Sequence, residues 1–329
     1  MIRAAHGAVR VPGLDAPHDT AHFRIFYPAA LSGDDVERLT GNVAADPSAA
    51  PWPVVVILPG INIGPEGYRW LACELAERGC AVLTMALVGE TMAGVIGITP
   101  GLDLEACRPD QYGTRPTATA LAPLLAELGR RNADGPLAGL FDLGRVVLGG
   151  HSGGGTVALQ NANPAWFPGI VATFAFASHT MASTMLGYEP STILALPAEL
   201  PTLLIAGELD GVMARSADRY RTTDDAGRAD GHDPVRRTFD EAVRSPVGTA
   251  HFAVLRGAVH TSMIWPSDST TARGFLDPPP GRNEADVRAA LGGLIADFIG
   301  GHVQSDQVTL QRLANRLADR TDCVEGLTR

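Results

Sequence analysis

Short apolar runs alternate with stretches of helical periodicity over most of the chain. The run 54–58 is apolar throughout, rich in β-branched residues and bounded by Pro53 and Pro59-Gly60, which is typical of a strand buried on both faces. Comparable runs predict strands at 80–87, 145–149, 170–176, 202–206 and 252–255. Apolar positions at helical spacing predict helices at about 66–78, 116–131, 153–162 and 284–299. This alternation predicts an α/β fold with a mostly parallel central sheet and helices on both faces.

Further segments surround this alternation. Residues 7–11 and 22–27 could form an antiparallel hairpin at one edge, and 301–329 is expected to be a C-terminal helical tail outside a single domain of residues 1–300. Three insertions interrupt the pattern, at 88–114, 178–200 and 211–234. Each follows a predicted strand, so we expect all three over a ligand site at the carboxyl edge of the sheet. The third is rich in aspartate but lacks the spacing of a calcium loop, which indicates a solvated loop.

Composition narrows the possible partners and surroundings. The chain is 45% hydrophobic and carries a formal net charge of −10, which argues against nucleic-acid partners and anionic membranes. No apolar run is long enough for a membrane span, and the first residues lack the pattern of a signal peptide. Four cysteines, with no metal-type spacing, favour a reduced, cytoplasmic setting: Cys73, Cys80, Cys107 and Cys323. We expect neither a metal nor an organic cofactor, and the oligomeric state stays open.

The segment 150–154 reads Gly-His-Ser-Gly-Gly and lies between a predicted strand and a predicted helix. A sharp turn there would lift the hydroxyl of Ser152 out of the backbone, as in hydrolases with a nucleophilic serine. A glycine-rich structural turn or a phosphate-binding loop are the alternatives. The phosphate interpretation lacks both the Lys-Ser/Thr of a P-loop and a Gly-x-Gly-x-x-Gly spacing. We therefore interpret Ser152 as a nucleophile.

A nucleophilic serine needs a base and a carboxylate that orients the base. In hydrolases with this turn, the chain order is serine, acid, histidine. Asp210 follows the strand 202–206 and is our candidate acid, with Glu208 as the second choice. His260 follows the last predicted strand and is the candidate base, with His179 as its rival. His151 adjoins the serine but would point away from it.

Acyl transfer also requires hydrogen-bond donors for the oxyanion of the tetrahedral intermediate. The backbone N–H of Gly153, directly after the serine, is one candidate. The second should come from the loop after the first long buried strand, where the N–H of Ile61 is the natural donor. A helix-entry turn built on Gly60 and Gly64 is compatible with the same residues.

These segments resemble the polyester-hydrolase (cutinase-like), chlorophyllase and dienelactone-hydrolase branches of the α/β hydrolases. The resemblance covers about residues 52–265 and is carried by the segments 58–60, 70–84, 150–155, 201–210 and 257–260. It implies the α/β-hydrolase fold and Ser-His-Asp ester hydrolysis. Those enzymes are typically secreted and disulfide-tied, and they carry a pocket-wall tryptophan where this chain has Ser178 before His179-Thr180. The resemblance therefore does not imply a polyester substrate.

Apolar side chains gather in the segments that leave the carboxyl ends of the predicted strands. They suggest an adaptable pocket for a hydrophobic acyl or alcohol part of a small-molecule ester. The alternative is that the methionines among these apolar side chains merely fill gaps beneath long loops. The predicted pocket residues are Met92, His179, Met181, Met185, Met213, Met263 and Trp265.

The favoured function is hydrolysis of a carboxylic ester through an acyl-enzyme. Lactone or thioester hydrolysis, acyl transfer and C–C bond hydrolysis remain open with the same three residues. Epoxide or haloalkane hydrolysis is disfavoured, because it needs an aspartate at the position of Ser152. A hypothesis of another class is a non-catalytic ligand-binding protein that retained the fold.

Overall fold

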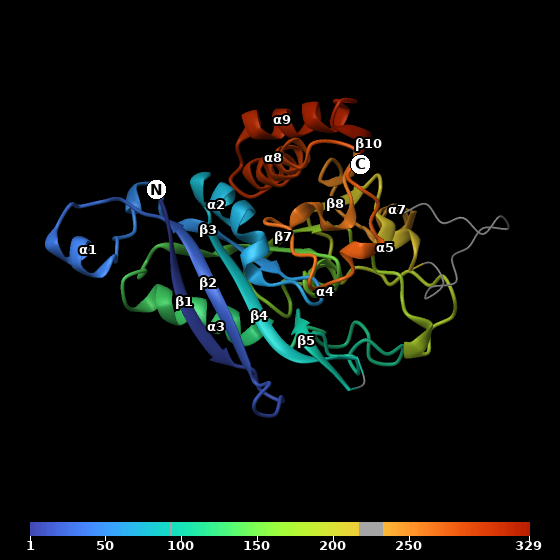
Figure 1. Cartoon of the computed structure of the whole chain (residues 1–329), viewed down its shortest axis with the longest axis horizontal. Coiled ribbons are helices and arrows are strands. Elements are labelled where there is room, and N and C mark those ends of the chain that lie inside the picture. The colour runs from blue at the N-terminus through green and yellow to red at the C-terminus, as the bar shows by residue number, and fades with distance from the viewer. Residues whose placement is uncertain (93, 217–232) are drawn as a thin grey trace.

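In the described part of the chain, residues 1–92, 94–216 and 233–329 of this computed structural model, the strands form one mixed ten-stranded sheet (Figure 1). The strand order is β1-β2-β4-β3-β6-β7-β8-β9-β10, and β5 pairs with β4 off this path. Neighbours from β4 across to β9 are parallel, whereas β1, β2, β5 and β10 pair antiparallel. The strands are β1 (Ile2–Arg10), β2 (Thr20–Pro28), β3 (Trp52–Leu58), β4 (Ala81–Met92), β5 (Val95–Thr99), β6 (Phe141–His151), β7 (Ile170–Phe176), β8 (Thr202–Gly207), β9 (Ala250–Leu255) and β10 (Cys323–Thr328).

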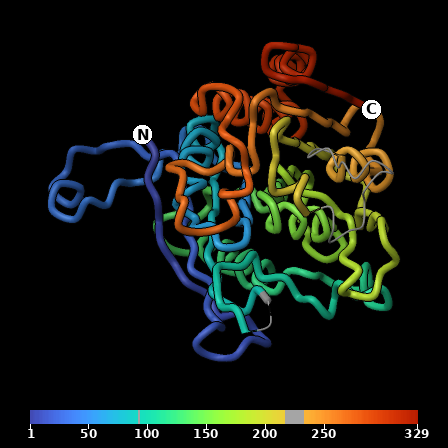
Figure 2. The backbone as a smooth tube through the Cα atoms, turned by 45° about the vertical axis from the view of Figure 1, so that its right-hand side comes forward, coloured from blue at the N-terminus to red at the C-terminus, as the bar shows by residue number. Residues whose placement is uncertain are grey.

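Helices cover both faces of this sheet. The longer helices are α2 (Arg69–Glu77), α3 (Leu121–Ala133), α4 (Gly153–Asn161), α8 (Glu284–His302) and α9 (Gln307–Ala318). The shorter ones are α1 (Asp35–Thr40), α5 (Gly211–Ala214) and α7 (Asp233–Arg237), with 3-10 turns η1 (Pro47–Ala49), η2 (Pro65–Tyr68), η3 (Thr184–Leu186), η5 (His260–Met263) and η6 (Gly274–Leu276) and the π turn η4 (Thr238–Ala242). Helix α1 lies in a segment that extends away from the sheet (Figure 2).

The core consists of two apolar layers, one on each face of the sheet. On β3, Val55 and Ile57 join the cluster beneath α2 and α8, whereas Val54 and Val56 join the cluster beneath α3 and α4. Every residue of β3 is buried, which explains why this strand reads as a continuous apolar run. The predicted α/β class with a mostly parallel sheet and helices on both faces is therefore confirmed.

The sheet extends further than the apolar pattern indicated. Strand β4 continues to Met92 and returns as β5, so segment 88–114 begins with an antiparallel hairpin rather than a loop. Gly89, Glu90 and Thr91 interrupt the apolar run, but a strand at a sheet margin needs only main-chain pairing to continue. The N-terminal hairpin is present as β1 and β2, in longer form than 7–11 and 22–27.

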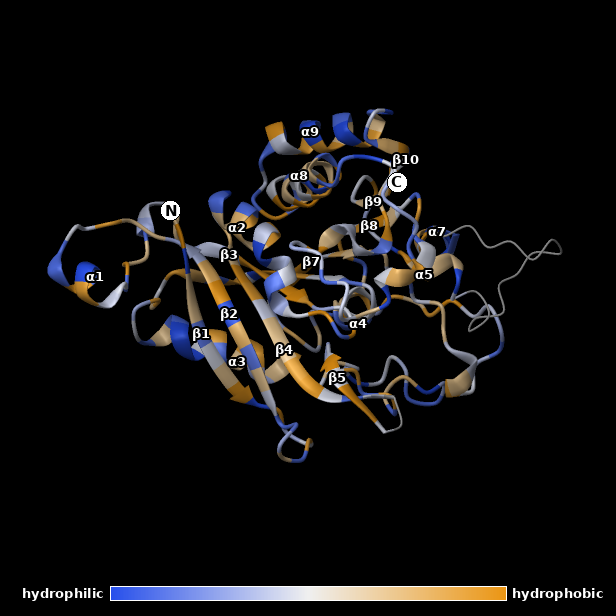
Figure 3. Cartoon of the chain, in the orientation of Figure 1, coloured by the Kyte–Doolittle hydropathy of each residue, from blue (hydrophilic) through white to orange (hydrophobic). Residues whose placement is uncertain are grey.

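Residues after α8 belong to the same unit as the sheet. Helix α9 buries Leu313 and Leu317 and presents polar residues on its outer side (Figure 3). Strand β10 then pairs with β9, with Leu327 opposite Phe252. The tail at 301–329 is thus a helix followed by an edge strand. Because β10 has six residues with Gly326 among them, it carries no apolar alternation from which a strand could be predicted.

Candidate active site

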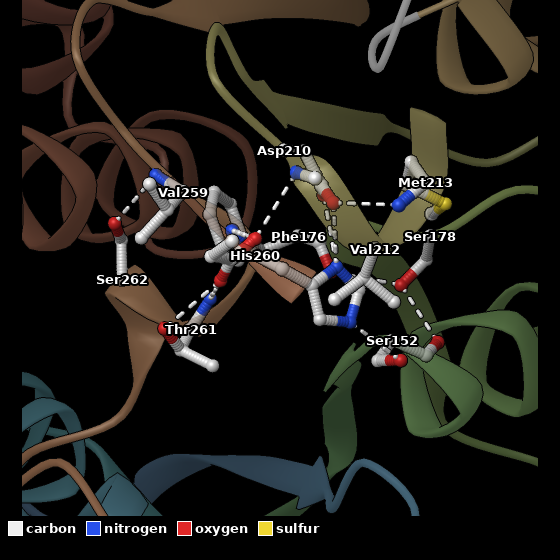
Figure 4. Close-up of polar contacts among 12 residues, drawn as sticks. Ser152, Phe176, Ser178, Asp210, Val212, Met213, Val259, His260, Thr261 and Ser262 are labelled. Atoms are coloured by element: carbon white, nitrogen blue, oxygen red, sulfur yellow. Dashed lines mark hydrogen bonds and ion pairs between the residues drawn. The ribbon is translucent and has the colours of Figure 1, made fainter. Parts of the chain in front are cut away.

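Four loops at one edge of the sheet bring the predicted residues together. Ile61 follows β3, Ser152 follows β6, Asp210 follows β8 and His260 follows β9. The carboxyl ends of parallel strands share one edge of a sheet, so residues far apart in sequence meet there. The side chains of Ser152, His260 and Asp210 form a continuous row (Figure 4).

Ser152 occupies a strained turn between β6 and α4. Its backbone angles are φ 53° and ψ −126°, a region that residues with a side chain rarely adopt. The turn is tight because α4 begins directly behind β3: a Cβ on Gly154 would overlap the carbonyl oxygen of Leu58. Glycine at 154 therefore lets the helix approach the strand, as in the turns that expose a nucleophilic serine.

The three side chains are joined by hydrogen bonds. His260 Nε2 lies 2.9 Å from Ser152 Oγ, and His260 Nδ1 lies 2.9 Å and 3.1 Å from the two carboxylate oxygens of Asp210. Since a carboxylate only accepts, Nδ1 carries the proton and the unprotonated Nε2 faces the serine hydroxyl. Asp210 is 2% and His260 5% exposed, so water competes little for these bonds. This is the geometry in which a histidine can take a proton from the serine.

Asp210 is held by the start of the short helix that follows it. One of its oxygens accepts the backbone N–H of Met213 at 2.8 Å, as a helix N-cap. Glu208, the alternative acid, does not point at the histidine in this way. Its Oε2 accepts the N–H of Gly257 at 2.7 Å and links the ends of β8 and β9. Asp210 is thus the carboxylate that orients His260.

A second carboxylate, which sequence reasoning missed, supports the same loops. Asp277 Oδ1 accepts the N–H groups of Gly211 at 3.0 Å and His260 at 3.2 Å, and Oδ2 accepts the N–H and hydroxyl of Thr261 at 3.1 Å. Burial raises the pKa of Asp277, the proximity of His260 lowers it, and Asp210 raises it further. The residue lies in an aperiodic, proline-rich segment, so no sequence signal identified it.

His179, the rival base, is buried and uses a ring nitrogen for a local backbone contact. Its Nδ1 accepts the backbone N–H of Met181 at 3.1 Å, and its carbonyl accepts the hydroxyl of Thr156 at 2.8 Å. Burial lowers the pKa of His179 to about 4, an effect that Asp210 opposes and His260 reinforces. The preceding Ser178 is not a pocket wall: its hydroxyl lies 2.8 Å from the carbonyl oxygens of Ser152 and Phe176 and braces the turn.

The two predicted oxyanion donors are neighbours. A Cβ on Gly153 would lie 3.2 Å from Cγ1 of Ile61, so the loop after β3 packs directly against the start of α4. The Gly153 N–H belongs to the first turn of that helix, where N–H groups lack intrahelical acceptors and favour negative charge. Ile61 and Ser152 also line the same cavity.

A cavity of about 280 Å³ opens at Ser152. Its walls come from the loop after β3, the β4–β5 hairpin, α5 and the segment after η5. A wider cavity of about 570 Å³ adjoins it and shares Ile63 and Ala272 with it. Sequence reasoning missed most of the lining, because the wall residues share no periodic pattern. The lining residues are Ile61, Asn62, Ile63, Thr91, Val95, Ser152, Val212, His260, Ala272 and Arg273.

Among the residues that the structure describes, none of the predicted methionine pocket lines this cavity. Met181, Met213 and Met263 are buried, with Met213 and Met263 in the apolar core, and Met185 is 89% exposed. Trp265 is stacked beneath the guanidinium of Arg288. The positions of Met181, Met213 and Met263 fit the alternative that methionines fill gaps beneath loops, whereas Met185 fits neither interpretation. Met92 ends β4, and its side chain lies outside the described part, as do residues 217–232 of the insertion at 211–234.

No group of three or more histidine, cysteine, aspartate or glutamate side chains in the described ranges could hold a metal ion. None of the helices described is long and apolar enough to cross a membrane. Comparison with models of known protein families found no match, and a search of curated proteins found none either.

Proposed function

We propose that this chain is a serine hydrolase of the α/β-hydrolase fold that cleaves a carboxylic ester through an acyl-enzyme. The observation that carries the proposal is the continuous row of hydrogen bonds from Ser152 Oγ through His260 to Asp210. The topology supports it too: the serine, acid and histidine follow β6, β8 and β9 in the chain order typical of this fold.

In the acylation step, Ser152 Oγ attacks the carbonyl carbon of the ester while His260 Nε2 takes its proton. Asp210 keeps the Nδ1 proton in place and stabilises the imidazolium that forms. The carbonyl π electrons move to oxygen, and the N–H groups of Ile61 and Gly153 stabilise that oxyanion. When it collapses, the C–O bond to the alcohol breaks, and His260 Nε2–H protonates the leaving alkoxide.

Deacylation repeats these steps with water. His260 Nε2 takes a proton from a water molecule as its oxygen attacks the acyl carbon. The second tetrahedral intermediate collapses, the bond to Ser152 Oγ breaks, and the serine regains its proton from His260. The products are the free acid and an unchanged enzyme.

The cavity suggests which esters would be accepted. Ile61, Ile63, Val95 and Val212 give it an aliphatic lining, which favours a hydrophobic acyl or alcohol part. Its volume of about 280 Å³ is at the lower end of small-molecule sites, which span roughly 300–1,000 Å³. We therefore propose short to medium chains in this part of the site.

A fluorophosphonate probe tests the proposal, because it phosphonylates only an activated serine. We expect labelling at Ser152 in the wild-type protein, none in S152A and strongly slowed labelling in H260A. The same variants should lose hydrolysis of p-nitrophenyl butyrate. Labelling of H260A at the wild-type rate, or no labelling of the wild type, would favour the non-catalytic ligand-binding alternative.

A further inference from the structure

Two fully buried polar side chains lie directly behind Ser152. His151 ends β6 and Tyr68 ends the 3-10 turn η2, and both are 0% exposed. The Tyr68 hydroxyl is 3.0 Å from His151 Nδ1 and also accepts the backbone N–H of Gly60 at 2.9 Å. The other ring nitrogen, His151 Nε2, is 2.8 Å from the carbonyl oxygen of His260. Every hydrogen-bonding atom of the two side chains is therefore paired.

The direction of each hydrogen bond follows from the two end groups of this network, the Gly60 N–H and the His260 carbonyl oxygen. The carbonyl oxygen of His260 only accepts, so His151 Nε2 carries a proton and donates it. The N–H of Gly60 only donates, so the Tyr68 oxygen accepts from it. The Tyr68 O–H then donates to an unprotonated His151 Nδ1. This arrangement satisfies all groups only when His151 is neutral.

Packing around the imidazole favours the neutral form. The ring stacks on Phe176 with centroids 5.8 Å apart, and the ring of His260 lies 5.0 Å away. Burial, and secondarily the nearby His260, lower the pKa of His151 well below its usual value. A charged imidazole would have no carboxylate partner here and would repel a protonated His260.

The two ends and the middle of this network lie at three parts of the proposed catalytic site. Gly60 immediately precedes the oxyanion donor Ile61, and its own carbonyl accepts the N–H of Ile63 at 3.2 Å. The peptide that bears the Ile61 N–H is thus held at its carbonyl, and the peptide before it is held at the Gly60 N–H. His151 adjoins Ser152 in sequence. The other end is the backbone carbonyl of His260, the proposed base.

Gly60 must approach this network closely. A Cβ at this position would lie 2.6 Å from Cδ1 of Ile63 and 3.2 Å from His151 Nδ1. Glycine therefore allows the Gly60 N–H to reach the Tyr68 hydroxyl beside the imidazole. The loop after β3 is consequently docked onto the strand that carries the nucleophile.

We propose that Tyr68 and His151 are positioning residues for ester hydrolysis. Together they hold two parts of the site in register with Ser152: the loop after β3, which carries the Ile61 N–H, and the backbone of His260. The inference rests on the proposed function. Neither residue lines the cavity at Ser152. Their effect is geometric, and small displacements of catalytic groups can lower rates on the order of a hundredfold.

The first test is Y68F, which removes the hydroxyl and leaves the Gly60 N–H and His151 Nδ1 without partners. We expect kcat for p-nitrophenyl butyrate to fall about 10- to 100-fold while KM changes less than about threefold. A trifluoromethyl ketone that forms a tetrahedral adduct on Ser152 should bind more weakly by the same factor as kcat/KM falls, since both depend on the oxyanion site.

Conservative variants of His151 test separately its hydrogen bond with the Tyr68 hydroxyl and its hydrogen bond with the His260 carbonyl. H151N retains an acceptor at the position of Nδ1, and H151Q retains a donor at the position of Nε2, whereas H151L retains neither. Each amide variant should therefore recover part of the activity lost in H151L. In the double variant Y68F/H151L the losses in log kcat should not add, because both changes disrupt one network.

Y112F is the matched control. Its hydroxyl donates to the Ala195 carbonyl at 2.8 Å, so this variant loses one internal hydrogen bond of a tyrosine where Y68F loses two. We expect Y112F to lower Tm by no more than Y68F does, with kcat and inhibitor affinity as in the wild type. If Y68F and H151L, measured while folded, keep wild-type kcat and inhibitor affinity, or if Y112F loses as much activity as Y68F, the inference is overturned. Absence of ester hydrolysis and of Ser152 labelling in the wild type would instead overturn the proposed function, and this inference with it.

Discussion

Asp277 accepts the backbone N–H of His260 at 3.2 Å, with the same oxygen that accepts the Gly211 N–H at 3.0 Å. One carboxylate oxygen thereby joins the loop that carries Asp210, the proposed acid, to the loop that carries His260, the proposed base. His260 is held at several points: its N–H by Asp277, its carbonyl by His151 and its ring by Asp210. Each of these contacts restricts the rotation and translation of the imidazole.

The variant D277N should lose both stability and activity. An amide offers one accepting oxygen and one donating NH₂, so the NH₂ would face backbone N–H groups that need an acceptor. Leaving a buried group of this kind unpaired costs about 1–3 kcal/mol, and these groups are partly buried, which places the cost toward the lower end. We expect the free energy of unfolding in urea to fall by that amount and kcat to fall at least about tenfold. D268N is the control, since Asp268 bonds only within its own turn and is exposed; equal effects in both variants would contradict a role for Asp277.

The assignment of the acid is tested by D210N against E208Q. Asparagine at 210 would no longer hold the histidine in the tautomer with Nδ1–H, and the equivalent change in a serine protease lowers kcat about 10⁴-fold. In E208Q an amide oxygen can still accept the Gly257 N–H, so we expect kcat within about threefold of wild type. Steady-state hydrolysis of p-nitrophenyl butyrate measures kcat for both variants. If E208Q lost far more activity than D210N, the acid would be reassigned to Glu208.

The packing of the serine turn predicts that G154A is strongly destabilising. The added methyl group would overlap the carbonyl oxygens of Leu58 and Pro59, which are backbone atoms with little freedom to move. Overpacking of this kind costs about 1–3 kcal/mol or more, and the displaced turn should lose activity. G129A is the control: its Cβ meets nothing closer than 3.9 Å in α3, and it should stabilise the protein by roughly 0.5–1 kcal/mol. Thermal unfolding measures both variants: Tm should fall in G154A and rise in G129A.

Buried histidines predict a loss of stability in acid. Burial lowers the pKa of His179 to about 4 and that of His251 to about 3, and it also lowers the pKa of His151 and His302. Unfolded histidines titrate near about 6.5, so below that pH the unfolded chain binds more protons than the folded one. The free energy of unfolding should therefore fall with pH, by up to about 1.4 kcal/mol per pH unit for each such histidine.

Urea unfolding at pH 7.5, 6 and 5 measures this slope. The full stability is present above about pH 6.5 and declines as the pH falls toward the lowered pKa values. H251Q removes one of the titrating groups and should reduce the slope between pH 6 and 5. An unfolding free energy that is constant or increases over this interval would contradict the prediction.

The size of the cavity predicts a preference for short esters. In a p-nitrophenyl series, kcat/KM should be highest for acetate to hexanoate and fall sharply toward palmitate, whose chain exceeds the space at Ser152. V95W, in the wall, should shift the preference to shorter chains. V88W, on β4 outside the lining, should leave it unchanged. A maximum at palmitate would show that the wider adjoining cavity receives the acyl chain.

Part of the site followed from local sequence alone. A β-branched run ending in Gly-His-Ser-Gly-Gly and followed by a helix predicts a tight strand-to-helix turn, and Ser152 occupies one. Asp210 and His260 each directly follow a strand of the parallel sheet. Parallel strands deliver their carboxyl ends to a single edge, so the order of elements along the chain was enough to predict that these residues meet.

Other features depended on contacts between segments that share no pattern. The pairing of β10 with β9, the inward packing of Met181, Met213 and Met263, and the cavity wall at Ala272 and Arg273 arise only when distant segments pack together. The hydrogen bonds of Asp277 and of the Tyr68–His151 pair are of the same kind. A carboxylate or an imidazole in an aperiodic segment has many potential partners in the unfolded chain, and only burial beside particular backbone groups selects among them. The order of the strands therefore brings the side chains of Ser152, His260 and Asp210 together. The packing of loops around them determines which groups hold these side chains and the volume of the cavity beside Ser152.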